Sequence, residues 1–289
     1  PCSYCSTQNA KSLVRADDRV IAWLRGTHNG GAFPIRYFLA GPRVVNDTYG
    51  LFFYDPNGDY VGAYEKNYGF SLFGWRKGVM IVQSEDGTLW SALSGRAISG
   101  PQAGQQLKRI PSLVTDWNYW LMLHPESTTY DLFDGQKYPD SPLPRKLNSY
   151  ALSAVEQSAK SLDPLQPVLG VALDGQSVAF PLDVDQPRAS IHFEIAGRRI
   201  AMFWYAATKS SVAFERELDG RQLTFYADKI SPPTAPFKDK ETGTRWSIAG
   251  RGIDGPLRGK ELKWVNSIQC RWYAWSAEYP DTQIYDKEP

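Results

Sequence analysis

The chain has 289 residues, of which 42% are hydrophobic and 22% are charged, a composition typical of a globular protein rather than a disordered or fibrous one. Its 32 basic and 31 acidic residues give a net charge of +1 without a long basic run, which argues against a nucleic-acid partner. No apolar stretch approaches the roughly 20 residues that a membrane-spanning helix needs, so the sequence predicts no transmembrane segment.

The N-terminal segment, residues 1–16, contains Cys2 and Cys5 in a Cys-x-x-Cys spacing. This spacing lets both sulfurs bind one metal ion or form a redox disulfide. The pair is half of a tetrahedral site, and His28 is a candidate for a further ligand. Three cysteines, with Cys270 as the third, do not make a disulfide framework. A metal ion at Cys2 and Cys5, a redox dithiol and inert thiols stay open as alternatives.

The compartment also stays open. The chain begins with Pro1, and its first methionine is Met80. Signal peptidase disfavours proline immediately after its cut, so Pro1 is a poor mature end for a secreted protein. We keep both a cytoplasmic location and export with a leader outside this numbering.

Two parts of the chain repeat one another. Residues 88–107 read TLWSALSGRAISGPQAGQQL, and residues 244–262 read TRWSIAGRGIDGPLRGKEL. Five later residues recur after 155 positions, namely Trp117, Trp120, Pro125, Tyr130 and Asp131. This pattern predicts a first repeat domain at 17–133 and a second at 165–289, joined by a linker with a short helix at 134–164.

Short β-rich segments flank most Asn-Gly and Asp-Gly pairs, which are typical of type I′ hairpins. These pairs are Asn29-Gly30, Asn57-Gly58, Asp86-Gly87, Asp174-Gly175 and Asp219-Gly220. The predicted fold class is mainly β with a few short helices (α+β), built as two tandem homologous antiparallel β domains. A helix with Thr115 as N-cap should carry Trp117 and Trp120, and a second should lie within residues 150–162, where Leu152 and Leu162 belong to an apolar series at helical spacing.

Aromatic residues make up 13% of the chain and include ten tryptophans. The tryptophans that recur in both copies are predicted to be core residues. Four unrepeated ones are candidates for a binding surface: Trp23, Trp75, Trp204 and Trp264. We interpret His124 as a helix-end packing residue, because its counterpart is Tyr279, and His192 as a strand residue.

Several motifs occur in a characteristic order: Ala32-Phe33-Pro34-Ile35, Val45-Asn46-Asp47-Thr48, Leu89-Trp90-Ser91, Gly100-Pro101 and Trp117 through Pro125. In this order they resemble domain-of-unknown-function family 3179, a family of uncharacterised bacterial proteins, and they recur more loosely from Val168 to Asp286. The family typically carries Tyr-Cys-Pro-Leu-Cys, which implies thiol or metal chemistry. Here residues 54–58 and 204–208 stand at that place without cysteine. The resemblance therefore implies that the usual chemistry is lost from both copies.

Whether the protein is an enzyme stays open, because we find neither a Gly-x-Ser-x-Gly nucleophile motif nor a phosphate-binding glycine motif. The leading hypothesis is a non-catalytic binding or assembly protein, with a protein partner or self-association. The alternatives are a thiol-redox or metal-binding protein that uses Cys2 and Cys5, and a carbohydrate-binding or carbohydrate-processing protein.

Overall fold

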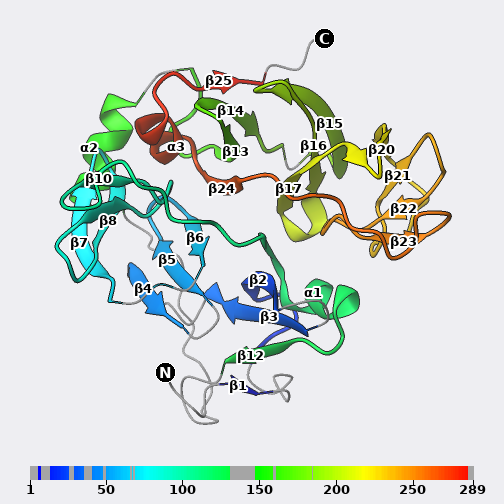
Figure 1. Ribbon diagram of the computed structural model, residues 1–289, viewed down its shortest axis with the longest axis horizontal. Helices are drawn as coiled ribbons and strands as arrows, with labels where there is room; N and C mark the ends of the chain where they lie inside the picture. Colours follow the sequence, from blue (N-terminus) through cyan, green and yellow to red (C-terminus); the bar gives the residue numbers. More distant parts are fainter. Residues whose placement is uncertain are drawn as a thin grey trace.

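The computed structural model describes residues 6–7, 14–25, 29–35, 41–47, 50–65, 67, 69–130, 147–158, 161–183 and 185–285. Cys2, Cys5 and His28 lie outside these residues. The described chain is mostly antiparallel β-sheet with short helices, as predicted (Figure 1). The helices are α1 (Trp117–Leu123), α2 (Ser149–Gln157) and α3 (Trp272–Glu278), with a 3-10 turn η3 (Ala206–Thr208).

Elements β1 to β12 and α1, here called the first half, form three sheets. The first sheet has the order β1 (Ser6–Thr7), β12 (Thr128–Tyr130), β3 (Asn29–Pro34), β2 (Arg19–Arg25) and β11 (Ser112–Asp116). The second is β4 (Arg43–Asn46), β5 (Leu51–Asp55) and β6 (Tyr60–Tyr64). The third is β10 (Ala97–Ser99), β9 (Leu89–Ser91), β8 (Val79–Gln83) and β7 (Ser71–Arg76).

Elements β13 to β25 and α3, here called the second half, form a closely similar set. One sheet is β24 (Ser267–Arg271), β13 (Pro167–Leu173), β14 (Gln176–Pro181) and β25 (Gln283–Ile284), and another is β15 (Arg188–Ile195), β16 (Arg198–Tyr205) and β17 (Ser210–Glu215). A third is β20 (Phe225–Ala227), β21 (Phe237–Asp239), β22 (Arg245–Trp246) and β23 (Gly252–Asp254). A small hairpin joins β18 (Glu217–Leu218) to β19 (Arg221–Gln222).

The two halves share details of hydrogen bonding as well as strand order. Each contains one parallel pair, β3 with β12 and β14 with β25, in otherwise antiparallel sheets. The backbone N–H of Trp117 donates to Asp18, and that of Trp272 donates to Gln166. Each helix ends with a capping N–H that donates back to a tryptophan carbonyl, Trp120 in α1 and Trp275 in α3.

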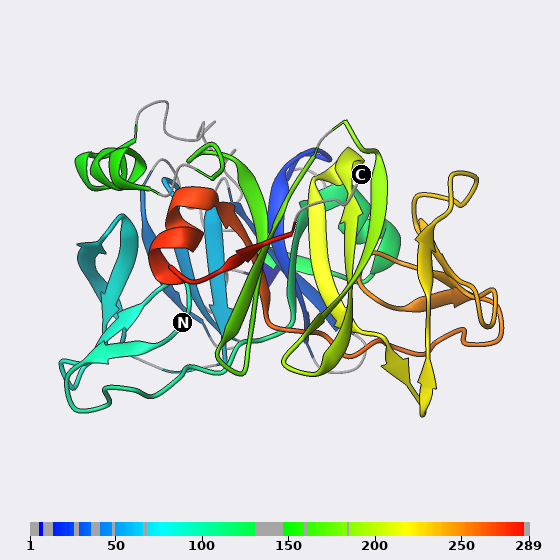
Figure 2. The same cartoon turned by 90° about the horizontal axis from the view of Figure 1, so that it is seen from above.

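The helices α1 and α3 each contact sheets of the opposite half (Figure 2). Tyr273 of α3 lies in a buried cluster with Tyr60 and Met80 of the first half. Tyr119 of α1 lies in a cluster with Phe203 and Phe237 of the second half, and its hydroxyl donates to the Pro233 carbonyl over 2.7 Å. Since seven residues are too few for a stable isolated helix, this reciprocal packing stabilises both helices and joins the halves into one body.

The tryptophans that recur in sequence are core residues, as predicted. Trp90 and Trp246 are buried, and each indole N–H has a polar partner on the neighbouring strand or loop. Trp90 Nε1 donates to Ser84 Oγ over 2.9 Å, and Trp246 Nε1 donates to Asp239 Oδ2 over 2.8 Å. The helix tryptophans are buried too: Trp117, Trp120, Trp272 and Trp275.

The turn predictions are confirmed in part. Asp174-Gly175 and Asp219-Gly220 both have two positive φ angles, as a type I′ turn requires. Asn29-Gly30 is wrong as a turn, because both residues lie in β3. In the turn after β5 the residue with positive φ is Asp59, at 49°, rather than the predicted Asn57-Gly58 pair. Asp86-Gly87 lies in the loop of the β8–β9 hairpin, where only Gly87 has a positive φ.

Two helix boundaries also differ from the prediction. Thr115 is not an N-cap, since it lies in β11 and the cap residue is Asp116. No side chain caps α1; its first N–H groups instead donate to backbone carbonyls at Asp18 and Ala16. The α2 helix begins at Ser149, one residue before the predicted segment, with the Asn148 side chain accepting from the Ala151 N–H, and it ends at Gln157, before the predicted end at residue 162.

Candidate functional site

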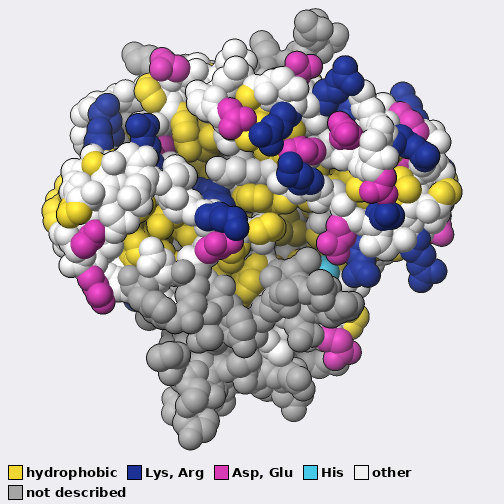
Figure 3. All heavy atoms as spheres, viewed as in Figure 1, with side chains coloured by type: hydrophobic (Ala, Val, Ile, Leu, Met, Phe, Trp, Pro, Cys, Tyr) yellow, Lys and Arg dark blue, Asp and Glu magenta, His cyan; other side chains and the backbone are white. Residues whose placement is uncertain are grey.

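A pocket of about 340 Å³ lies where α1, β2 and β11 of the first half meet β17 and the loops around β23 of the second half. We call it the aromatic pocket. Its principal side chains are Trp23, Trp120, His124, Phe214, Arg251, Glu261 and Trp264. Figure 3 shows hydrophobic side chains exposed in a hollow near the centre of one face, with charged side chains around it.

The walls of the aromatic pocket are fixed by packing. Trp120 is only 2% exposed, and its ring lies 4.1 Å from that of His124, centroid to centroid. Trp264 is half-buried and forms an antiparallel bridge with Phe214. The indole N–H groups of Trp120 and Trp264 have no hydrogen-bond acceptor among the described residues. Both N–H groups are themselves buried, so neither is exposed to the pocket.

Polar side chains complete the same pocket. Burial, together with the nearby positive charge of Arg251, lowers the pKa of His124 to about 4, so the imidazole is neutral at pH 7. Arg251 and Glu261 are exposed and face each other across a β-bridge. Neither forms an ion pair within the part of the chain that the structure describes. The pocket therefore combines stacking surfaces with hydrogen-bond donors, an acceptor and both signs of charge.

At the equivalent position of the other half, different side chains are packed together. There Tyr64 forms a bridge with Arg109, as Phe214 does with Trp264. Arg109 lies over the Tyr64 ring, 5.0 Å from its centroid, and also donates to the Leu93 carbonyl. The Tyr64 hydroxyl bonds to the carbonyls of Ala92 and Leu93. The side chains of Arg109 and Tyr64 occupy this position in the first half. The second half has Trp264 and Phe214 at the equivalent positions, so these hydrogen bonds are absent there.

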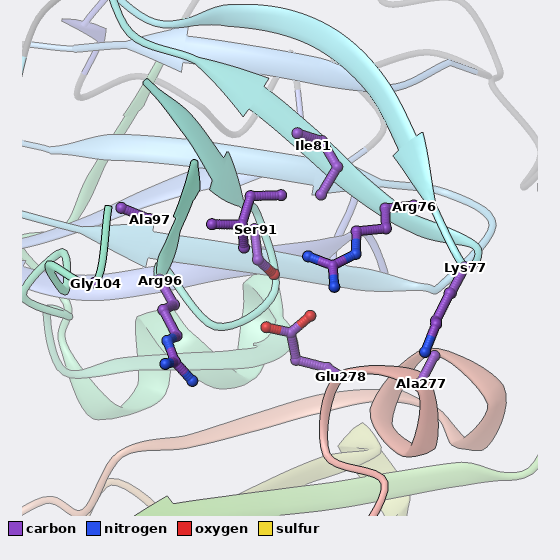
Figure 4. Close-up of a pocket in the computed structure, with 10 residues that line it drawn as sticks. Arg76, Lys77, Ile81, Ser91, Arg96, Ala97, Gly104, Ala277 and Glu278 are labelled. Carbon is purple, nitrogen blue, oxygen red and sulfur yellow. The ribbon is translucent and has the colours of Figure 1, made fainter. Parts of the chain in front are cut away.

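A second pocket, of about 370 Å³, lies between the β7–β8 and β9–β10 hairpins of the first half and the end of α3 (Figure 4). We call it the basic pocket. Its charged side chains are Arg76, Lys77, Arg96 and Glu278, and its inner wall includes Ser91. Figure 4 shows Arg76 and the Glu278 carboxylate pointing into the same space beside the Ser91 hydroxyl.

Residues 54–58, which stand where the resemblance places a cysteine pair, form a buried turn. Asp55 is 0% exposed, and its Oδ1 accepts from the backbone N–H of Asn57 over 2.9 Å. Its Oδ2 has no hydrogen-bond partner among the described residues, and burial raises the pKa of this carboxyl to about 6. The Arg271 side chain donates to the Asn57 carbonyl, and the Arg271 N–H to that of Gly58. The turn therefore forms part of the contact between the halves.

The corresponding turn of the second half, residues 204–208, is held differently. Tyr205 stacks obliquely on Tyr119 at 5.5 Å, and Arg188 lies over its ring. Thr208 is buried, and its hydroxyl bonds to that of Ser210 over 2.8 Å. Neither turn presents a thiol, which agrees with the loss of the cysteines seen in the sequence.

The four tryptophans proposed as a binding surface are not gathered in one place. Trp23 and Trp264 line the aromatic pocket together, from opposite halves. Trp75 is half-buried and stacks on the exposed Tyr150 at 5.3 Å. Trp204 is 3% exposed, and its indole N–H donates to the carbonyls of Asp183 and Gln186. A binding role for these residues stays a prediction, with the strongest geometric support at Trp23 and Trp264.

The metal prediction at Cys2, Cys5 and His28 falls outside the described residues. Among those that are described, no group of three or more His, Cys, Asp or Glu side chains is arranged to hold a metal ion. Cys270 is buried in β24, and burial raises the pKa of its thiol. His192 accepts a hydrogen bond from the Phe225 N–H at Nε2, which agrees with a structural strand residue. No helix of the described chain is long and apolar enough to cross a membrane.

Comparison with known families matches the model described as a protein of unknown function (DUF3179) to residues 65–282, which is more than half of the chain. The chain belongs to this family. The match is one continuous range that begins in the first half and ends in the second. No curated protein and no solved structure matches the chain significantly.

Sequence reasoning missed several residues of the aromatic pocket, among them Trp120, Arg251 and Glu261. Trp120 was assigned to the core because it recurs as Trp275, and it is indeed buried, but one edge of it faces the pocket. A usable signal was present in the repeat: Arg109 and Trp264 are 155 positions apart and differ in chemistry. Such a mismatch between the two halves marks a place where one half has a feature that the other lacks.

Proposed function

We propose that this protein is a non-catalytic binding protein that arose by tandem duplication of one domain, and that its ligand site is the aromatic pocket between the two copies. The matching strand order and hydrogen bonds of the halves support the duplication. The proposed domains are those predicted from the sequence, 17–133 and 165–289, with residues 134–164 between them.

One observation carries the proposal: the same inter-domain position is filled by Arg109 in one half and open beside Trp264 in the other. Packing alone does not require the open pocket, since Arg109 shows how the space can be filled. Concave sites with apolar walls and a few convergent polar groups are the usual form of small-molecule sites. The neutral imidazole of His124 could act as a base, but among the described residues that line the pocket we find no nucleophile paired with it. Binding is therefore favoured over catalysis.

A carbohydrate ligand is the second candidate. Sugars present apolar C–H faces that stack on indole rings, and hydroxyl groups that both donate and accept hydrogen bonds. The pocket offers Trp264 beside Glu261 and Arg251, which matches both requirements. A carbohydrate would thus be bound without a second carboxylate placed to hydrolyse it.

Titration with anilinonaphthalene sulfonate, an apolar anion whose fluorescence rises in apolar sites, tests the proposal. We expect saturable binding to the wild-type chain, and loss of that binding in Trp264→Arg, which copies the residue of the closed site. Trp75→Ala is the control, because Trp75 lies outside the pocket. Equal binding to all three proteins would overturn the proposal. Competition by cellobiose would favour a carbohydrate ligand, and its absence would favour an aromatic or aliphatic one.

A further inference from the structure

We propose that the basic pocket is a second binding site, independent of the aromatic pocket, and that it binds small phosphate esters carrying free hydroxyl groups. The pocket is defined by Arg76, Lys77, Arg96, Ser91 and Glu278, with Ala97 in its wall. It lies within the first half and α3, whereas the aromatic pocket lies on the side of α1.

Charge is the first argument. Three cations and one carboxylate give the pocket a formal charge of +2, in a chain whose net charge is only +1. The side chains of Arg76, Lys77 and Arg96 form no ion pair or hydrogen bond within the described residues. All three side chains are exposed, so a bound anion can pair with them without displacing a partner among the described residues. A dianion such as a phosphate monoester neutralises the pocket.

The fold holds these cations in place. Arg76 ends β7, and Lys77 follows at the tip of the β7–β8 hairpin, with φ at 50° before Gly78 at 79°. Gly78 has no room for a larger side chain, because an added Cβ would lie 2.4 Å from the Ala154 Cβ of α2. Arg96 is fixed by its bridge to Gln106 and by its N–H, which donates to Ser94 Oγ over 3.2 Å. The backbone positions of all three cations are therefore defined by packing.

The inner wall adds a buried donor. Ser91 is 1% exposed, and its hydroxyl oxygen already accepts from the Ser94 N–H over 3.3 Å. Because a hydroxyl oxygen that accepts can also donate, the Ser91 proton is available to a phosphate oxygen in the pocket. Arginine guanidinium groups suit phosphate in the same way, through paired N–H donors.

Glu278 defines the rest of the ligand. Its carboxylate accepts from the Ser94 hydroxyl, so it is held inside the pocket near the cations (Figure 4). A carboxylate repels a bare phosphate but accepts a hydrogen bond from a ligand hydroxyl. The pocket volume of about 370 Å³ also exceeds the size of a single phosphate ion. Both features favour a phosphate ester of a polyol over inorganic phosphate.

Isothermal titration of the full chain with glycerol 3-phosphate, inorganic phosphate and glycerol tests this proposal. We expect saturable binding of glycerol 3-phosphate that weakens as NaCl rises, weaker binding of phosphate, and none of glycerol. Arg96→Gln should weaken glycerol 3-phosphate binding at least tenfold. Arg258→Gln is the matched control: Arg258 is exposed, lines neither the basic pocket nor the aromatic pocket, and its side chain forms no ion pair or hydrogen bond within the described residues, so affinity should stay within twofold of wild type.

Glu278→Gln supplies a test of opposite sign. Since it removes a negative charge and keeps an oxygen that can accept from Ser94, inorganic phosphate should bind several-fold more tightly. Thermal unfolding of each variant verifies that it is folded, and ³¹P NMR titration of the wild type measures binding without any substitution. Absence of glycerol 3-phosphate binding to the wild type, or equal losses in Arg96→Gln and Arg258→Gln, would overturn the proposal. Neither result bears on the aromatic pocket, which is tested with a different probe.

Discussion

Arg109 and Trp264 occupy equivalent positions in the two halves, each bridged to an aromatic residue of the strand beside it, yet only Arg109 fills the space between the halves. Arg109 donates to the Leu93 carbonyl and lies over the Tyr64 ring, whereas Trp264 leaves a pocket with two unpaired indole N–H groups among the described residues. This difference is the structural basis of the proposed ligand site.

Substituting Trp264 by arginine should close the aromatic pocket. The substitution removes the Trp264 ring, which is one stacking wall of the pocket, and places a guanidinium there. We expect anilinonaphthalene sulfonate to bind at least tenfold more weakly, measured by fluorescence titration. The thermal unfolding midpoint should stay close to that of wild type, because Trp264 is half-buried rather than a core residue.

Asp55 should make stability depend on pH in an unusual direction. Burial raises its folded-state pKa from 3.8 to about 6, so the folded chain prefers the protonated acid. The stability that this proton contributes is complete below pH 3.8 and is lost as the pH rises through about 6.

Asp55→Asn should therefore raise the free energy of unfolding at pH 7.5 by about 1–3 kcal/mol and leave it almost unchanged at pH 4. The asparagine carbonyl can still accept from the Asn57 N–H, which keeps the turn in place. Urea unfolding of both proteins at the two pH values measures the effect. A loss of stability of the same size at both values would contradict the assignment of a carboxyl group whose charged form is disfavoured by burial.

Gly170 should not tolerate a side chain. An added Cβ would lie 2.2 Å from the Trp275 ring, so the helix α3 would have to move away from β13. We expect Gly170→Ala to destabilise the protein by about 1–3 kcal/mol, measured by chemical denaturation. Gly74→Ala is the control, since nothing lies within 4 Å of the Cβ it would add. Comparable losses in both variants would show that packing on Trp275 is not the cause.

Self-association, if it occurs, should involve the edge strand β7. This strand is the last of its sheet, and it exposes Leu72 at 41% and Phe73 at 58%. Open sheet edges with apolar side chains pair readily with other chains. Light scattering coupled to size-exclusion chromatography should show a mass that increases with concentration in the wild type and stays monomeric in Phe73→Lys. Identical behaviour of the two proteins would exclude β7 as the contact.

Much of the fold could be predicted from the sequence, because local patterns specify it. Asp174-Gly175 sets a type I′ turn by itself, and the recurrence of Trp90 as Trp246 indicates a core residue without knowledge of its neighbours. Predictions that depended on longer-range packing were less accurate. Asn29-Gly30 has the composition of a turn, but pairing with β2 draws both residues into a strand. Thr115 has the chemistry of an N-cap, but pairing with Val20 places it in β11.

The candidate site was harder to predict, since it lies between the halves. Trp23 and Trp264 were separated by more than 200 positions, and nothing in either local sequence indicates that they share a pocket. The same holds for Arg76 and Glu278, which belong to different halves and meet only because α3 packs across onto the first half. Both pockets thus lie where a short helix of one half contacts strands or loops of the other.

The most direct test of the central claim, that a ligand lies between Trp120 and Trp264, is the ¹H–¹⁵N NMR spectrum of the tryptophan indole groups during titration with anilinonaphthalene sulfonate. The ten tryptophans give separate indole signals that single Trp→Phe variants assign. We predict that the signals of Trp120 and Trp264 shift together and saturate, while that of Trp204, already bonded to Asp183 and Gln186, stays in place. Saturation with no shift at Trp120 and Trp264, or with shifts at other tryptophans only, would contradict the account.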